Sequence, residues 1–484
     1  MSREDQIIQE RMRKLEEIKK ANINPYPSKF DKKNDISNCL KSKLGIKVVT
    51  AGRLMTKRDN GKIIFSNLRD GSGEMQIVLQ EGETPKQAIE FFKKYIDSGD
   101  FVGVEGKIFK TKTKQISILV KKIEILSKSI LPLPEKFHGL QDEEEKLRKR
   151  YLDLIMNPEV KKIFEKKAVF WKTIREFLLK KGFVEVETPI IEASAGGAAA
   201  TPFKTKHNAL DLDVFLRISM GELWQKKLMV AGYEKTFEIG RQFRNEGIDM
   251  EHLQDYTQME FYWAYADYKD GMKLVEELYK EVVKKVLGTL KFKTHSYEID
   301  LGKKWEIHDY ETIIKKHTGI DIYKANEKEI KKKLEELKVS YKNVSNKWRL
   351  VDVLWKYCRK KLSGPGFLIG QPVEISPLAK RNSKDKRKVE QFQVIIAGTE
   401  MGNGYSELND PFDQEQRFEE QMKLKSAGDT EAQEHDKEFV EALKYGMPPV
   451  CGFGVSERLF SYLMDKSARE CVLFPLMKPE ERLL

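Results

Sequence analysis

Hydrophobic and polar residues alternate in short runs between Val48 and Leu126. Turn stretches such as RDNGK and DGSGE separate the runs, which read KVVTAGRLMTKR, KIIFSNLRD, EMQIVLQ, FVGVEGKIFKT and QISILVKKIEIL. Period-two alternation is typical of strands with one buried face. Five such strands, with one helix (TPKQAIEFFKKYI) inserted late, predict an all-β barrel of the OB type over residues 45–130.

Helical spacing dominates the segment before this barrel. Ile7, Ile8, Met12, Leu15 and Ile18 recur at helical intervals with a charged outer face until NPYP ends the pattern, so residues 1–44 form a predicted N-terminal helical segment. Prolines and dense mixed charge mark residues 131–160 as a linker. Beyond it, EVKKIFEKKAVFWKTIREFLLKKGF has the pattern of a long amphipathic helix.

Longer alternating runs follow, interspersed with helices: KTFEIGRQF, YTQMEFYWAY, KVEQFQVIIAG and CVLFPLM. They predict a large, mainly antiparallel sheet over residues 161–484 and hence an α+β fold class. A helix-rich, lysine-rich block at about 268–363 is interpreted as an insertion on this sheet domain. The stretch EMGNGYSELNDP reads as a continuation of the buried strand FQVIIAG.

Composition narrows the class of protein. A chain of 484 residues exceeds one hydrophobic core, so two or more domains are expected. The apolar stretches are shorter than a membrane span and the N-terminus lacks a secretory signal, which predicts a soluble, cytoplasmic protein without a membrane partner. The four cysteines form no CxxC pair. A net charge of +12 favours an anionic partner without choosing between nucleic acid and a lipid surface.

Polar residues interrupt two of the predicted strands. Strand alternation brings Arg244 onto one face and Glu260 onto the face of the returning strand, which suits a ligand with both anionic and cationic groups, although a plain surface hairpin is the alternative. In EMGNGYSELNDP, Glu407 shares a face with Asn403, and Glu400 joins them only through a bulge at Gly402 or Gly404. Buried carboxylates require a cation, either a metal or an ammonium group.

A third polar stretch, PPVCGFGVSERLFSYLM, places Gly452 and Gly454 ahead of a predicted helix with Arg458 in its first turn. Glycines that allow close approach beside an arginine suit a nucleotide phosphate. CVLFPLM is expected to return as a strand.

These pieces, in order, resemble the three signature motifs of class II aminoacyl-tRNA synthetases: FVEVETPII with Pro189, FRNEG to TQMEFYWAY, and GFGVSERL. Three further stretches are similar to the lysyl-tRNA synthetase family: GGAAATPFKTKHNALDLDVFLRIS, QPVEISPLAKRN and EMGNGYSELNDPFDQEQRFEEQ. The resemblance implies an OB-fold anticodon-binding domain before an antiparallel-sheet catalytic domain. It also implies ATP-dependent activation of L-lysine and its transfer to the 3′ end of tRNA(Lys).

The resemblance also implies roles for particular residues. Arg244 would bridge the lysine carboxylate and the α-phosphate, and Arg458 would hold the γ-phosphate or back the adenine. Lysine would contact Gly197, Glu222, Glu260, Tyr262, Asn403, Tyr405 and Glu407. ATP would contact Arg244, Glu246, His252, Tyr256, Glu400 and Arg458. Mg²⁺ bound to ATP would be reached by Glu400, with Glu407 as a second candidate.

On the OB-like domain, the family positions that stack on and hydrogen-bond anticodon bases fall on Phe65 and Gln76, while Lys57 and Arg58 would follow phosphates. The alternative for Phe65 is an ordinary core residue. Motif 1 forms a dimer interface in the family, so the resemblance implies a homodimer.

Three departures from the family pattern are visible. Gln393 stands where the bacterial family usually has a second metal-binding Glu, GFGVSER is one residue shorter than the usual motif 3, and HLQDYT replaces the usual motif 2 sequence.

Three rival hypotheses are an aspartate-specific enzyme of the same fold, a non-catalytic RNA-binding relative, and a paralogue that lysylates a protein. Two carboxylates in the substrate pocket disfavour the first, and retention of Arg244, Glu400 and Arg458 disfavours the second. An anticodon domain disfavours the third.

Overall fold

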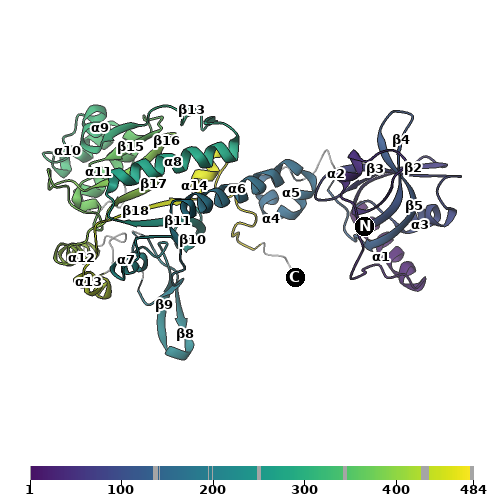
Figure 1. The fold of residues 1–484 in the computed structure, drawn as a ribbon, viewed down its shortest axis with the longest axis horizontal. Helices are drawn as coiled ribbons and strands as arrows, with labels where there is room; N and C mark the ends of the chain where they lie inside the picture. The colour runs from purple at the N-terminus through teal and green to yellow at the C-terminus, as the bar shows by residue number, and fades with distance from the viewer. Residues whose placement is uncertain are drawn as a thin grey trace. The chain divides into compact units, whose positions relative to one another are not determined.

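The computed structural model describes residues 2–134, 140, 142–194, 196–198, 200–247, 252–341, 346–426 and 435–479. It divides into two compact units, residues 1–141 and 142–484 (Figure 1). Part of the predicted linker, residues 135–139 and 141, and residues 248–251 of the motif 2 loop lie outside the described residues.

The first unit is a closed five-stranded barrel with the strand order β1-β2-β3-β5-β4. Its strands are β1 (Lys47–Asp59), β2 (Ile63–Arg69), β3 (Glu74–Gln80), β4 (Phe101–Lys110) and β5 (Ile116–Ser127). Three helices accompany the barrel: α1 (Arg3–Lys20), α2 (Ile36–Lys41) and α3 (Lys86–Tyr95). Inward residues such as Val48, Ile64 and Ile77 are buried together, as the alternation of each strand requires.

Helix α1 is fixed to this barrel by an arginine as well as by apolar packing. Ile18 is buried in the barrel's core cluster. Arg11 donates hydrogen bonds to the carbonyl groups of Ser98, Ser129 and Leu131, at 2.7, 3.2 and 2.8 Å respectively. The predicted N-terminal helical segment is therefore built into the first unit.

An eight-stranded sheet forms the centre of the second unit, in the order β14-β15-β16-β17-β18-β11-β10-β6. The pairs β10–β6 and β14–β15 are parallel and the other pairs are antiparallel. These strands are β6 (Val184–Glu185), β10 (Lys235–Phe243), β11 (Asp255–Ala264), β14 (Glu306–Asp309), β15 (Gly366–Ile369), β16 (Gln391–Ile396), β17 (Thr399–Ser406) and β18 (Val450–Ser456). The predicted α+β fold class is confirmed.

The remaining elements surround this sheet. A small sheet has the order β7-β9-β8, with β7 (Ile191–Glu192), β8 (Lys204–His207) and β9 (Leu212–Leu216), and a hairpin pairs β12 (Lys291–Thr294) with β13 (Tyr297–Asp300). The helices are α4 (Glu143–Arg148), α5 (Arg150–Met156), α6 (Pro158–Lys180), α7 (Glu222–Val230), α8 (Tyr268–Leu287), α9 (Tyr310–Thr318), α10 (Glu327–Glu336), α11 (Lys347–Arg359), α12 (Pro411–Ser426), α13 (Lys437–Lys444) and α14 (Arg458–Leu463). Two 3₁₀ turns, η1 (Asn208–Leu210) and η2 (Val373–Ile375), complete them.

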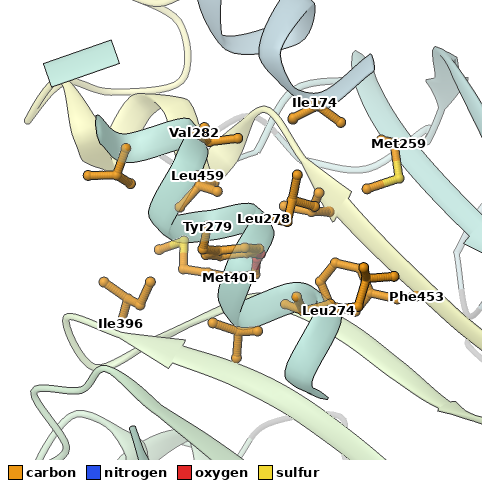
Figure 2. Packing of buried hydrophobic residues seen from close by; sticks show 14 of the residues in the cluster. Ile174, Met259, Leu274, Leu278, Tyr279, Val282, Ile396, Met401, Phe453 and Leu459 are labelled. Carbon is orange, nitrogen blue, oxygen red and sulfur yellow. The ribbon is translucent and has the colours of Figure 1, made fainter. Parts of the chain in front are cut away.

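Helix α8 covers one face of the large sheet. Leu274, Leu278, Tyr279 and Val282 of α8 pack against sheet residues that include Phe453 (Figure 2). The helix therefore belongs to the main core and not to an insertion, so the predicted insertion at 268–363 starts too early. A second buried cluster joins α9, α10 and α11 to Leu368 of β15 and Ile395 of β16.

Three further sequence expectations differ from the structure. The predicted linker 131–160 ends in helices α4 and α5, where Asp153 and Arg150 form a buried ion pair at 2.9 Å. Residues 471–477, CVLFPLM, form no strand; apolar composition without a partner edge does not make one. EMGNGYSEL does not continue the strand before it, because Ala397 and Gly398 reverse the chain and β17 pairs back on β16.

Within the described part of the chain, no helix is both long and apolar enough to cross a lipid bilayer.

Candidate active site

One row of residues runs straight across the face of the large sheet opposite to α8. Direct strand pairing aligns Glu238, Glu260, Gly454, Asn403 and Gln393, one from each of five neighbouring strands. The next row along aligns Thr236, Tyr262, Gly452, Tyr405 and Gln391. Because side chains alternate along a strand, the intervening residues, such as Phe261 and Phe453, face the core.

The two glycines of β18 create space in the middle of these rows. A Cβ atom on Gly452 would lie 2.0 Å from Oε1 of Glu407 and 2.8 Å from the Tyr262 ring, and one on Gly454 would lie 3.1 Å from Glu260. Side chains at either position would fill the gap between β11 and β17. The glycines predicted to allow close approach therefore form the floor of a pocket.

A β-bulge turns Glu400 onto the same face. Gln393 pairs with Asn403, but Ile395 pairs with Glu400, so Met401 and Gly402 together stand opposite a single residue of β16. The extra residue changes the parity of the strand, which brings Glu400 to the side of Asn403 and sends Met401 into the core. Gly402 has φ +156° at this point. The bulge lies at Gly402, one of the two positions considered from the sequence.

A cavity of about 780 Å³ opens on this face. Every residue proposed from the sequence for lysine or ATP lines it: Gly197, Glu222, Arg244, Glu246, His252, Tyr256, Glu260, Tyr262, Glu400, Asn403, Tyr405, Glu407 and Arg458. The sequence hypothesis thus selected residues that the fold brings to one place.

Glu260 lines the cavity, where it is buried and fully hydrogen-bonded. Its Oε1 accepts from the backbone N–H of Met220 at 3.1 Å and from Nε2 of Gln258 at 2.7 Å, and its Oε2 accepts from the hydroxyl of Tyr262 at 3.0 Å. Burial and the nearby Glu222 carboxylate raise the pKa of Glu260 to about 7. Ionisation of Glu260 is therefore unfavourable in the free protein, and a bound cation would stabilise the carboxylate form.

A lysine that the sequence analysis missed lies among these carboxylates. Nζ of Lys226, on α7, lies 2.8 Å from Oε1 of Glu222 and 2.6 Å from Oε2 of Glu407. Tyr405 donates a hydrogen bond to Glu222 and its ring lies 5.5 Å from the same ammonium. Burial raises the pKa of Glu407 to about 8, and Lys226 opposes that shift. Glu407 therefore has an ammonium partner in the chain itself.

Two arginines, Arg244 and Arg458, also line the cavity. The backbone N–H of Arg244 donates to Gln254 O at 2.7 Å, its Nε lies 3.4 Å from Ile218 O, and its guanidinium is 5.8 Å from the Tyr256 ring centroid. Arg458 is the first residue of α14, and its buried Nε has no hydrogen-bond partner among the described residues. Both guanidinium groups remain able to bind an anion.

The cavity offers few oxygen donors for a magnesium ion. Glu400 lines the cavity. Gln393, the direct strand partner of Asn403, is not a lining residue, and its buried Oε1 has no hydrogen-bond partner among the described residues. No group of three or more His, Cys, Asp or Glu side chains among the described residues could hold a metal. This donor set fits Mg²⁺, which proteins commonly bind through one or two carboxylates together with substrate phosphates.

The insertion also contributes residues that the sequence analysis did not identify. Asp352, Lys356 and Arg359, all on α11, line the cavity. In the sequence they read as the charged face of an ordinary helix, and only their spacing of four and three residues hinted at a common direction. Lys226 was equally hidden, because a lysine in an amphipathic helix normally faces solvent.

The proposed anticodon residues lie on the outer surface of the barrel. Phe65 is half-buried and directly paired with exposed Arg58 across β1 and β2, so it is not part of the barrel's core cluster. Oε1 of Gln76 accepts a hydrogen bond from Ser117 at 3.0 Å. Nζ of Lys57 instead donates to the carbonyls of Phe92, Lys93 and Ile96 at the end of α3. This structural contact removes Lys57 from the surface available to phosphate.

Both units match known families. Residues 142–478 match the family described as tRNA synthetases class II (D, K and N), and residues 48–126 match the OB-fold nucleic acid binding domain. The fold, the carboxylate-lined cavity and this match agree, and the chain belongs to the class II tRNA synthetases of the D, K and N group.

Curated relatives refine the position within that class. Lysine–tRNA ligase of Thermosipho africanus is 43% identical over 482 residues, covering 97% of this chain and 96% of the relative. Lysine–tRNA ligase of Thermotoga maritima is 43% identical over 484 residues, with 98% and 96% covered. Lysine–tRNA ligase 2 of Methanosarcina mazei is 42% identical over 481 residues, with 97% and 94% covered. The resemblance to lysyl-tRNA synthetases inferred from the motifs is confirmed by these relatives.

Proposed function

We propose that this protein activates L-lysine with ATP to lysyl-adenylate and transfers the lysyl group to the 3′ end of tRNA(Lys). One observation carries the choice of lysine: the charge count of the buried pocket. Glu222, Glu260 and Glu407 supply three carboxylates, and Lys226 supplies one ammonium. The two negative charges left over match the two ammonium groups of free lysine, and Arg244 is available for its carboxylate.

The α-ammonium and ε-ammonium groups of lysine would bind at different residues of this pocket. Gly197 has φ +85°, and a Cβ there would lie 3.2 Å from Cβ of Glu222, so the backbone approaches Glu222 closely enough to share an α-ammonium. Glu260 and Glu407 would receive the ε-ammonium, with the rings of Tyr262 and Tyr405 beside the alkyl chain. A pocket built around a polar group rejects substrates that lack it by roughly 10⁴ to 10⁵.

Activation in such a site needs no side-chain nucleophile. A carboxylate oxygen of lysine attacks the α-phosphorus, and the bond to the bridging oxygen of pyrophosphate breaks. Arg244 would contact both the carboxylate and the α-phosphate, while Arg458 would neutralise phosphate charge. His252 and Glu246 would contact ATP, and Tyr256 would stack on the adenine. When ATP brings Mg²⁺, Glu400 would hold it; Glu407, paired with Lys226, is left out of the metal set.

The barrel is proposed to read the anticodon. Phe65 presents an aromatic ring on the outer face beside Arg58, an arrangement that suits stacking on an unpaired base next to a phosphate. Gln76 would add an edge contact. An enzyme that charges tRNA acts where translation occurs, and a cytoplasmic location is proposed on that ground.

A homodimer is proposed through the motif 1 region. Apolar side chains there are exposed: Val169 (39%), Leu179 (49%), Val184 (49%), Ile190 (46%) and Ile191 (55%). Neighbouring exposed apolar residues of this kind mark interaction surfaces. Sedimentation analysis would test the proposal: a monomer at micromolar concentration contradicts it.

Lysine-dependent exchange of pyrophosphate into ATP tests the catalytic proposal. Exchange with lysine and Mg²⁺, but not with aspartate, is expected. Equal exchange with aspartate would favour the rival specificity, and no ATP binding at all would favour a non-catalytic RNA-binding relative. Charging of tRNA(Lys), in preference to a protein acceptor, separates the enzyme from the third rival.

A further inference from the structure

Helix α11 presents a charged face to the catalytic cavity and an apolar face to the sheet. Asp352, Lys356 and Arg359 line the cavity. On the other side of the helix, Leu354 and Cys358 are buried in the cluster that contains Ile395 of β16. Ile395 is the direct strand partner of Glu400. The helix is therefore fixed to the part of the sheet that carries the proposed metal-binding carboxylate.

The charges on this face are only partly paired with one another. Oδ2 of Asp352 lies 2.9 Å from Nζ of Lys356, so these two side chains form an ion pair. Nε of Arg359 is buried and has no hydrogen-bond partner among the described residues. Arg359, on α11, and Arg458, on α14, both line the cavity together with Glu400. Two arginines from separate helices thus face the cavity that holds this carboxylate.

We propose that Arg359 binds the β- and γ-phosphates of ATP, and pyrophosphate as it leaves, from the insertion helix. The proposal rests on the function proposed above. The planar guanidinium matches phosphate oxygens in pairs and keeps its charge when partly buried. Arg244 lies directly after β10, with its Nε 3.4 Å from the carbonyl oxygen of Ile218. Arg359 lines the same cavity as Glu400, on the helix that packs against Ile395, the strand partner of Glu400, and the rest of a triphosphate would extend there.

This position gives Arg359 a defined part in activation. As the oxygen of the lysine carboxylate bonds to the α-phosphorus, the bond to the bridging oxygen breaks and its electron pair leaves with pyrophosphate. Arg359 would neutralise the negative charge that develops there, and no proton transfer is required. Lys356, paired with Asp352 and exposed, would act as a weaker second cation at the entrance.

The variant Arg359→Gln tests the proposal in full-length protein. We expect the KM values for ATP and for pyrophosphate in lysine-dependent exchange to rise about 10-fold, the effect of one lost charge-assisted contact. Affinity for a lysyl-sulfamoyl adenosine, which lacks the β- and γ-phosphates, should stay within about twofold of wild type. Arg359→Lys should recover part of the loss. Lys360→Gln, an exposed neighbour outside the cavity lining, is the matched control.

The outcomes separate this proposal from the proposed function. If the wild type exchanges with lysine and Arg359→Gln leaves both KM values unchanged, the phosphate contact is wrong. An equal loss of affinity for the phosphate-free analogue would mean that the substitution distorts the site, which also overturns the proposal. If the wild type fails to exchange with lysine, calorimetric binding of ATP to both proteins still decides: equal affinities contradict a role for Arg359.

Discussion

Nζ of Lys226 lies 2.6 Å from Oε2 of Glu407, and each side chain is 1% exposed. The same ammonium donates a hydrogen bond to Oε1 of Glu222. Charges this deeply buried are tolerated only as partners, because each has lost its hydration. The pair therefore makes this part of the pocket depend on Lys226 from α7 and on Glu407, the residue directly after β17.

Lys226→Met is expected to destabilise the second unit by about 3–5 kcal/mol, since it leaves Glu407 buried without a partner. Denaturant unfolding followed by tryptophan fluorescence measures the change. The double variant Lys226→Met/Glu407→Gln should cost less than the sum of the single variants, because neither charge remains alone. Additive costs below about 1 kcal/mol would contradict the buried pair.

Lysine binding is expected to strengthen as the pH rises from about 6 to about 8. The pKa of Glu260 is raised to about 7, so below that pH the free protein holds a neutral carboxyl group there. An ammonium group binds the carboxylate form, and binding must therefore release a proton. Glu407, with its pKa raised to about 8, acts in the same direction. KM for lysine should fall across this range, whereas KM for ATP serves as the internal comparison.

Calorimetry of lysine binding in two buffers of different ionisation enthalpy would detect the released protons directly. Glu260→Gln removes one titrating group and should flatten the pH profile as well as weaken binding. A KM for lysine that is constant between pH 6 and 8 would contradict the idea that substrate replaces protons on these carboxylates.

Gly452→Ala is expected to abolish lysine use while ATP still binds. The added methyl group would meet Oε1 of Glu407 at 2.0 Å and the Tyr262 ring at 2.8 Å, both of which are buried. A drop of at least about 100-fold in kcat/KM for lysine is expected, because the pocket cannot open without moving the sheet. Gly73→Ala, where the nearest atom is 3.7 Å away, is the matched control. Normal lysine use by Gly452→Ala would contradict the conclusion that Gly452 forms the floor of the pocket.

Phe65→Ala is expected to lower kcat/KM for tRNA(Lys) about 10-fold without changing lysine-dependent exchange, because one stacked base contributes roughly 1–3 kcal/mol. Phe101→Ala is the control: its ring is 38% exposed on β4 and lies 4.2 Å from the Arg53 guanidinium. Equal effects of both substitutions would mean that the barrel is merely weakened. A tRNA altered at the middle anticodon base should be charged poorly by the wild type and equally poorly by the variant.

The sequence predicted those parts of the fold whose cause is local. KTFEIGRQF is bounded in the structure at the residues that the alternation indicated, because both faces of β10 have fixed surroundings. The five barrel strands and the helix α3 were predicted for the same reason. CVLFPLM was predicted wrongly, since a strand needs a partner edge, which composition does not reveal.

In the candidate site, the sequence named the residues but not their geometry. Glu400 reaches the cavity only through the extra residue at Gly402, and a bulge depends on the pairing of β17 with β16. Lys226 and Arg359 were missed because each sits in a helix whose burial is decided by distant elements. Lys57 was misjudged on the same ground, as the carbonyls that bind it come from α3.

The row formed by Glu238, Glu260, Gly454, Asn403 and Gln393 draws one residue from each of five adjacent strands. A slip of one residue in the pairing of any of these strands would turn that strand's side chain in the row to the opposite face of the sheet. Substrate binding is thus a readout of correct pairing across most of the sheet. During refolding, lysine-dependent exchange should recover only when the last of these strands has paired in its correct register. The recovery of activity would therefore report the time at which the sheet is complete.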